Sequence, residues 1–147
     1  MDTILNNDEV QTSLQDLREI FSVFDDPLDK FSQIIDMGKK SKGLFAEEKN
    51  RYNQILGCSS EAWVVTKIDI NDCIIIRTDS DALIVKGLLS ILEFILSNKN
   101  KSVVKSITAQ EILNNINLNR SITSQRTNGF ISALNKIKSQ VKKINNG

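Results

Sequence analysis

The chain has 147 residues, with 19 lysines and arginines, 18 aspartates and glutamates, two cysteines and no histidine. This length suits one domain that buries a core without disulfides or metals. Two cysteines and no histidine exclude a multi-disulfide framework, a four-cysteine zinc site and mixed Cys/His metal sites. We therefore expect no bound metal, and a reducing, cytoplasmic setting.

The near-neutral total of +1 hides an uneven distribution of charge. Residues 1–36 hold nine acids and two bases, residues 37–97 hold eight of each, and residues 98–147 hold nine bases and one acid. The basic end could face nucleic acid or an acidic partner. No aromatic residues are interleaved with its lysines for base stacking, so we favour an ordinary solvated face and no nucleic acid.

Nothing in the sequence predicts contact with a membrane. The N-terminus has neither the basic nor the apolar region of a secretory signal. The longest apolar run, 82–96, is too short to span a bilayer and contains Lys86 and Glu93.

The first third predicts two helices after a disordered tail at residues 1–8. The apolar residues recur at three- and four-residue spacing over 10–24, which is typical of an amphipathic helix. Asp26 and Pro27 suit the N-cap and first position of a second helix, which we expect to end at Gly38. The predicted buried residues of this helix are Leu28, Phe31, Ile34 and Ile35. A short helix is expected near 47–52.

The middle of the chain predicts strands. Alternation over 62–70 favours a strand, and a two-residue turn at Asn71-Asp72 would pair Ile70 with Cys73 and Ile68 with Ile75. Cys73 would then lie in the core. A short third strand over 81–85 is expected to lead into a central helix over 86–96.

The last third predicts helices and completes the fold class. Thr108 and Glu111 form a capping-box pattern, a loop follows at 117–121, and Thr123 suits the cap of a long terminal helix. The expected fold is α+β, one domain over residues 9–147, with a small antiparallel sheet of about three strands flanked by helices.

Cys58 is the strongest candidate for chemistry. It follows Gly57 and precedes Ser59, Ser60 and Glu61, so the thiol lies on a polar turn instead of within an apolar element. A thiol is mostly protonated near neutral pH unless a cation or helix N-terminus stabilises the thiolate, and the local sequence supplies no cation. From these residues alone, Cys58 could be either a reactive cysteine or an incidental one.

Three other features of the sequence are candidate sites. Asp79-Ser80-Asp81 could bind a divalent cation, but a local turn is the better interpretation. Lys86-Gly87 lacks the glycine-rich loop of a phosphate site. Arg126 would occupy the third position of the terminal helix, where the helix dipole disfavours a cation. Two explanations for Arg126 remain. It could form an ion pair with the acidic N-terminal part, or it could stabilise a thiolate or contact a partner.

Three segments together resemble the SufE family of cysteine-desulfuration proteins. The segments are residues 53–63, 79–88 and 122–130, and they are similar to the family patterns Asn-x-Ile/Val-x-Gly-Cys-x-Ser-x-Val-Trp, Asp-Ser-Asp-Ala-x-Ile-Val-Lys-Gly and Leu-Thr-x-x-Arg-x-x-Gly. The segments occur in the same order as in the family and at similar separations. Ala62 replaces the usual valine, and the Leu-Pro common ahead of the cysteine region is absent.

The resemblance implies that Cys58 takes sulfane sulfur from the persulfide of a partner cysteine desulfurase similar to SufS. The sulfur would then pass to an iron–sulfur scaffold similar to SufBCD, and the desulfurase would be stimulated. The pyridoxal phosphate belongs to the partner, so this chain needs no cofactor of its own. The resemblance also implies a cysteine loop that swings out on docking with Gly57 as hinge, support of that loop by Asp81, and assistance from Arg126.

Two other classes of function can be compared with this one. The alternative is a non-catalytic binding module with an incidental Cys58, and the sequence does not decide whether the chain is an enzyme. An iron–sulfur scaffold would need three or four good ligands, which two cysteines without histidine do not supply.

Overall fold

We analysed a computed structural model of the chain, which describes residues 2–118 and 122–145, and the side chains of 9–118 and 122–144. Arg120 and most of the predicted loop at 117–121 lie outside this range. Within the described residues the fold is α+β with an antiparallel sheet of two strands and six α-helices, as the sequence predicts except for the strand count. The elements are α1 (Asp2–Ser22), α2 (Pro27–Lys40), the 3₁₀ turn η1 (Ala46–Glu48), β1 (Ala62–Ile68), β2 (Ile74–Ser80), α3 (Leu83–Leu96), α4 (Lys101–Ser106), α5 (Ala109–Asn115) and α6 (Ser124–Asn145).

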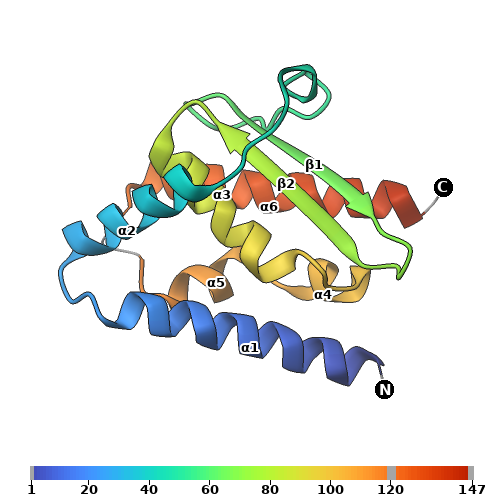
Figure 1. Ribbon diagram of the computed structural model, residues 1–147, viewed down its shortest axis with the longest axis horizontal. Coiled ribbons are helices and arrows are strands. Elements are labelled where there is room, and N and C mark those ends of the chain that lie inside the picture. The colour runs from blue at the N-terminus through green and yellow to red at the C-terminus, as the bar shows by residue number, and fades with distance from the viewer. Residues whose placement is uncertain (1, 119–121, 146–147) are drawn as a thin grey trace.

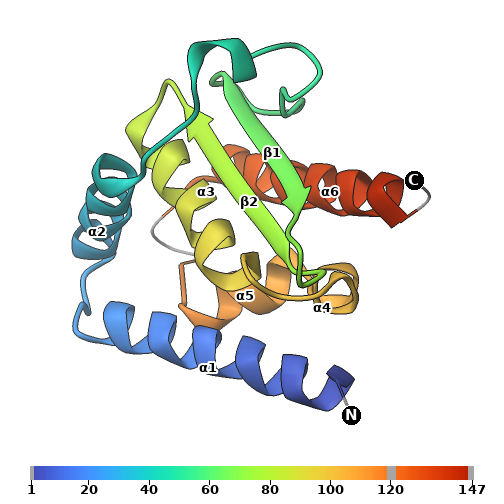
Figure 2. The same cartoon turned by 45° about the vertical axis from the view of Figure 1, so that its right-hand side comes forward.

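The two strands lie over α3 and α6, and α1 crosses below these helices (Figure 1). α3 packs against β2 and α2, whereas α6 packs against β1. The view in Figure 2 separates α2 at one side of α3 from α4 and α5, which lie next to α1. The core therefore fills the space between the sheet and α3, α6 and α1, with residues such as Leu17, Ile91 and Ile137 fully buried.

The predicted helix starts are confirmed by their capping bonds. The Asp26 side chain accepts a hydrogen bond from the Leu28 N–H, with Pro27 at the first helical position. The Thr108 hydroxyl accepts one from the Glu111 N–H, and the Thr123 hydroxyl accepts one from the Arg126 N–H. Each bond satisfies an N–H that has no partner inside its helix, which is why these residue types begin helices.

α1 is longer than the helix predicted at 10–24. It begins at Asp2, within the segment for which the sequence suggests disorder, and ends at Ser22. Four residues of its predicted apolar stripe, Val10, Leu14, Leu17 and Phe21, are at most 7% exposed, whereas the fifth, Phe24, lies beyond the helix and is half buried. The spacing of these residues therefore predicted correctly which side of α1 meets the core.

α2 continues past the predicted end at Gly38 and stops at Lys40. Gly38 is instead a packing residue, because a Cβ there would lie 2.4 Å from the Leu83 carbonyl oxygen of α3. Gly87 of α3 is also a packing residue, because a Cβ there would lie 1.9 Å from the Ile34 carbonyl oxygen of α2. The two glycines let the helix backbones approach closely. The prediction that Leu28 is buried is wrong: this side chain is 73% exposed in the first turn of the helix.

The sheet has two strands, not about three. The sequence 81–85, predicted as a third strand, forms a short connection and then the first turn of α3 from Leu83. Leu83 is half exposed and Ile84 is buried, so apolar residues here alternate as they do in a strand. Short apolar runs do not distinguish a strand from a buried helix, which explains the error.

The predicted strand register is wrong by one residue. β1 pairs Ile68 with Ile74 and Val64 with Thr78. The turn is longer than two residues, because the Asp69 carboxylate accepts hydrogen bonds from the Asn71 and Cys73 N–H groups. A slip of one residue exchanges the two faces of a strand. Ile74 and Ile76 therefore face the core, and Ile75 is 36% exposed.

Cys73 is not in the core, contrary to expectation. It lies in the turn before β2, half buried, with its thiol 3.8 Å from the Asn71 carbonyl oxygen. The turn at Asp69 moves it out of the sheet, since the main chain of Cys73 now closes the turn through a bond from the Asp69 N–H.

Candidate functional site

Cys58 lies in the turn that the sequence predicts, directly before β1. The residues on either side of this turn pair with each other: the Ile55 N–H donates to the Ala62 carbonyl, and the Val64 N–H donates to the Asn53 carbonyl. Residues 56–61, which we call the cysteine loop, project from this closed base. Gly57 has φ +90°, a left-handed conformation that a residue with a side chain adopts only at a cost. The glycine thus turns the chain so that Cys58 faces back toward the protein.

The Cys58 thiol packs against the N-terminal part of α6. Its S–H donates to the Gly129 carbonyl oxygen, 3.8 Å away, and the side chain is half buried against the core. A Cβ on Gly129 would lie 3.2 Å from the sulfur, so a glycine here leaves room for it. Gly129 belongs to the third family motif in the sequence, but the motif alone does not predict this contact.

A cavity of about 20 Å³ opens beside the sulfur. We call it the cysteine cavity; its lining is Cys58, Ser59, Val85, Leu88, Leu89, Gln125, Arg126, Gly129 and Phe130. One ordered water needs roughly 10–15 Å³ on this scale. The cavity therefore has room for about one further atom of the size of sulfur or oxygen, against a largely apolar wall.

Burial raises the pKa of the Cys58 thiol above its ordinary value. The desolvated site disfavours the thiolate, and no charged group forms a hydrogen bond with the sulfur among the described residues. At neutral pH the resting thiol is therefore protonated. Reactivity requires the loop to move or a partner to change these surroundings.

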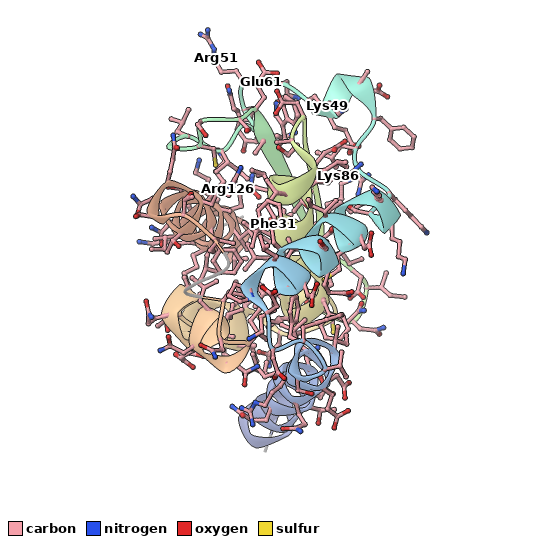
Figure 3. All side chains as sticks on the ribbon, turned by 90° about the vertical axis from the view of Figure 1, so that its left-hand side faces the viewer. Phe31, Lys49, Arg51, Glu61, Lys86 and Arg126 are labelled. Carbon is pink, nitrogen blue, oxygen red and sulfur yellow. The ribbon has the colours of Figure 1, made fainter. Side chains whose placement is uncertain are left out.

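Arg126 lines the same cavity from the third position of α6. Its guanidinium carbon lies 5.6 Å from the centre of the Phe31 ring of α2, and the two side chains lie together on the face shown in Figure 3. No carboxylate of the described residues lies within ion-pair distance of it. Of the two explanations that the sequence left open, an ion pair to the acidic end is thus absent from the part of the chain described, and proximity to the thiol is present.

The aspartates of the Asp79-Ser80-Asp81 motif have different surroundings. Asp79 is buried, and its carboxylate accepts hydrogen bonds from the N–H groups of Leu44 and Ser80. Lys49 and Lys86 approach it at 3.2 and 3.5 Å. Burial raises the pKa of Asp79, but these hydrogen bonds and the two ammonium groups outweigh it, so the net pKa is lowered.

Asp81 is exposed and reaches the cysteine loop through its main chain, whose N–H donates to the Glu61 carbonyl at 3.1 Å. Asp79, which sequence reasoning did not select, connects the loop at 41–49 to β2 and α3. Strand alternation gave no signal for its burial, because it puts Asp79 on the same side of β2 as Ile75, which is 36% exposed. Across the described residues, no three His, Cys, Asp or Glu side chains gather as a metal site requires.

Comparison with known proteins agrees with the resemblance found in the sequence. Residues 15–141 match the family model of SufE, an Fe–S metabolism associated domain. The chain belongs to the SufE family. Its three segments with family motifs converge in space, since Cys58, Val85 and Gly129 all line the cysteine cavity. The chain is thereby associated with Fe–S metabolism.

Relatives in bacteria and plants share this assignment. An uncharacterised SufE-like protein of Rhizobium etli is 33% identical over 88% of this chain and 90% of its own length. A second, of Rhizobium meliloti, is 33% identical over 88% and 94%. The SufE-like protein 1 of Arabidopsis thaliana, named as chloroplastic/mitochondrial, is 29% identical over 86% of this chain but only 34% of its own length.

The fold also matches a solved structure. The solution structure of a hypothetical protein from Thermus thermophilus superposes with a TM-score of 0.75 over 92% of this chain and 97% of that one, at 16% identity. At this identity the likeness supports the fold alone. In the described segments, no helix is both long enough and apolar enough to cross a membrane.

Proposed function

We propose that this SufE-family protein accepts sulfane sulfur on Cys58 from a partner cysteine desulfurase and passes it on for iron–sulfur cluster assembly. The observation that carries the proposal is the position of the Cys58 sulfur, on a left-handed glycine turn, at a small cavity shared with Arg126. Family membership supplies the class of reaction. Cytoplasmic location, a SufS-like donor and a SufBCD-like acceptor belong to the same proposal.

The transfer is an exchange at sulfur. The Cys58 thiolate attacks the terminal sulfur of the donor's persulfide, the donor's S–S bond breaks, and the donor cysteine leaves as a thiolate. The product is Cys58–S–SH, and no electrons are gained or lost overall. The donor's pyridoxal phosphate makes the persulfide, so this chain needs only a thiolate and a docking surface. A histidine base is unnecessary, which fits a chain without histidine.

The cysteine cavity supports a storage role. Its volume of about 20 Å³ accommodates one added sulfur atom, and its walls include Val85, Leu88 and Leu89. A persulfide held there is kept from solvent oxidants and thiols. Arg126, on the same cavity, supplies the positive charge that favours an anionic persulfide or the attacking thiolate.

Transfer requires the cysteine loop to open. The sulfur is half buried with a raised pKa, so a donor cannot reach a thiolate in this conformation. Gly57 is the proposed hinge, since its left-handed angle is accessible to glycine at little cost. Leu56, 77% exposed beside it, offers an apolar contact to a docking partner. Asp81 is proposed to hold the base of the loop through its bond to Glu61.

The test is to incubate the protein with a cysteine desulfurase, pyridoxal phosphate and cysteine, and to locate added sulfur by mass spectrometry. We expect one extra sulfur on Cys58 and faster cysteine turnover by the desulfurase. Cys58→Ser removes both effects. Cys73→Ser is the matched control, because that cysteine lies in the far turn of the hairpin and should leave both intact.

Two results would contradict the proposal. One is a wild-type protein that gains no sulfur while the desulfurase is active. The other is Cys58→Ser that stimulates the desulfurase as well as wild type does, which would favour the alternative of a binding module with an incidental cysteine.

A further inference from the structure

The second region of interest lies along the outer edge of β1 and shares no lining residue with the cysteine cavity. A groove of about 380 Å³ runs between this edge, the segment 52–53 and the C-terminal half of α6. We call it the β1 groove; its lining includes Tyr52, Asn53, Thr66, Lys67, Gln140 and Lys143. Its volume is within the range of ligand sites.

Hydrogen bonds at β2 determine which main-chain groups of β1 face the groove. The main chain of Ile74 bonds Asn98 and Lys99, and that of Ile76 bonds the Ser97 hydroxyl, so both residues direct their polar groups away from β1. Their partners in the antiparallel register are Ile68 and Thr66. These are non-hydrogen-bonded pairs, in which the main-chain N–H and C=O groups of both residues point away from the other strand. The N–H and C=O of Thr66 and Ile68 therefore face the free edge of β1.

The first half of this edge is already occupied by the protein's own chain. Gln54 forms an antiparallel bridge with Trp63, and the Val64 N–H donates to the Asn53 carbonyl. The segment ends its pairing there, and no described residue bonds the main chain of Thr66 on the outer side. The first half of the β1 edge is thus paired with the protein's own segment, and the second half has no paired strand among the described residues.

The groove also holds polar atoms without partners. The Thr66 hydroxyl and the Gln140 side-chain carbonyl are both buried and make no hydrogen bond with any described residue. The Gln140 amide nitrogen donates to the Val64 carbonyl at 3.3 Å, which fixes this side chain at the edge. Buried polar atoms are normally satisfied, so these two indicate a site that gains partners from something else.

The charge of the groove selects the occupant. Its lining contains Lys67 and Lys143 and no acidic residue. Lys136 and Lys143 both lie 5.8 Å from the centre of the Tyr52 ring, and the Lys136 ammonium donates to the Tyr52 carbonyl. A second copy of this chain would place like charges together at paired edges, because Lys67 would approach its own counterpart.

We propose that the β1 groove binds an extended acidic segment of a partner protein, which adds as a strand to the edge at Thr66 and Ile68. Main-chain hydrogen bonds provide the pairing, and the acidic side chains meet Lys67 and Lys143. This site is separate from sulfur transfer at Cys58, so the two proposals stand or fail independently.

The test uses the full chain labelled with ¹⁵N and a short capped peptide of alternating glutamate and valine, titrated at physiological ionic strength. We expect shifts and slowed hydrogen exchange at the Thr66 and Ile68 amides, and no comparable binding by a matched lysine–valine peptide. The double variant Lys67→Glu/Lys143→Glu should weaken the acidic peptide at least about tenfold and bind the basic one better.

Thr66→Pro tests the pairing directly. The Thr66 N–H points away from β2, so proline removes no bond of the sheet, and a proline is tolerated at such an edge position. Peptide binding should fall at least about tenfold, and Thr66→Val, which keeps the N–H but loses the hydroxyl, should weaken binding much less. Circular dichroism confirms that each variant is folded, and an unfolded Thr66→Pro leaves the charge reversal as the deciding variant.

Several results would overturn the inference. Absence of shifts at both amides up to millimolar peptide would mean that Lys67 only protects the edge from self-pairing. Equal binding of both peptides, or unchanged binding by the charge-reversed variant, would exclude the proposed recognition. Inorganic phosphate that binds in place of the peptide would indicate a small-anion site, and concentration-dependent dimerisation through β1 would indicate a second copy.

Discussion

The cysteine cavity and the β1 groove differ in volume and in how far their polar atoms are hydrogen-bonded. The cavity measures about 20 Å³ beside a half-buried thiol, and the groove measures about 380 Å³ along an open strand edge with lysines at its wall. In the cavity the thiol has a partner, the Gly129 carbonyl, whereas two buried oxygens in the groove have none among the described residues. The first region is suited to keep a reactive atom from solvent, and the second to receive polar groups from outside.

The largest effect on stability is expected at Asp79, which joins the loop at 41–49 to β2 and α3. Asp79→Asn removes the charge that holds Lys49 and Lys86 and should lower the free energy of unfolding by about 2 kcal/mol. Urea unfolding at neutral pH measures the change. Asp81→Asn is the matched control and should be close to wild type, since that side chain is exposed.

The pH dependence of this variant gives a second readout. The pKa of Asp79 is lowered in the folded protein, so its contribution to stability is present above the unfolded pKa and is lost as pH falls through the folded pKa. Wild type and Asp79→Asn should therefore converge in acid. A constant difference between them at all pH values would show that the carboxylate charge is not what holds the loop.

Gly57→Ala should disturb the cysteine loop at somewhat lower cost. Alanine is strained at φ +90°, and its Cβ would lie 2.7 Å from the Ser132 hydroxyl oxygen, so we expect a loss of about 1 kcal/mol. The thiol should also alkylate faster with iodoacetamide, because the loop no longer holds it against α6. Leu56→Ala, at the exposed neighbour, is the control and should change neither value; an unaltered rate in Gly57→Ala would argue against loop control of access.

The pH profile of Cys58 alkylation tests the buried state of the thiol with no change at the site. In a Cys73→Ser background, the native protein should reach half-maximal rate at a higher pH than the same chain in urea, because burial raises the pKa of Cys58. The native state holds this proton more tightly, so stability is unaffected below the unfolded pKa and falls as pH rises toward the folded pKa. Coincident profiles would mean that the loop is open in solution.

The smallest effect is expected at the groove. Thr66→Val removes a buried hydroxyl that has no partner, so the free energy of unfolding should stay within about 0.5 kcal/mol of wild type or rise. Thr78→Val is the contrasting control on the paired strand. Its hydroxyl donates to Glu93 at 3.0 Å, and its loss should cost about 1–2 kcal/mol. Similar losses in both variants would show that the Thr66 hydroxyl is in fact bonded.

The sequence by itself determined the features that depend on neighbouring residues. Asp26, Thr108 and Thr123 start helices because their side chains bond N–H groups two or three residues away. The apolar stripe of α1 and the turn at Cys58 likewise follow from local spacing and from Gly57. The family motifs named Cys58 and Arg126, and the structure brings both to one cavity.

Tertiary structure decided what depends on distant partners. The strand register is set by the Asp69 turn together with burial against α3. Cys73 therefore lies outside the core, contrary to the prediction, and Ile74 lies within it. Gly38 is a contact between helices instead of a cap, because its neighbour is the Leu83 carbonyl of α3. The burial of Asp79, the contact of Gly129 with sulfur and the open edge at Thr66 involve residues far apart in the chain. Local patterns carry no record of such contacts, which form only when the helices pack on the sheet.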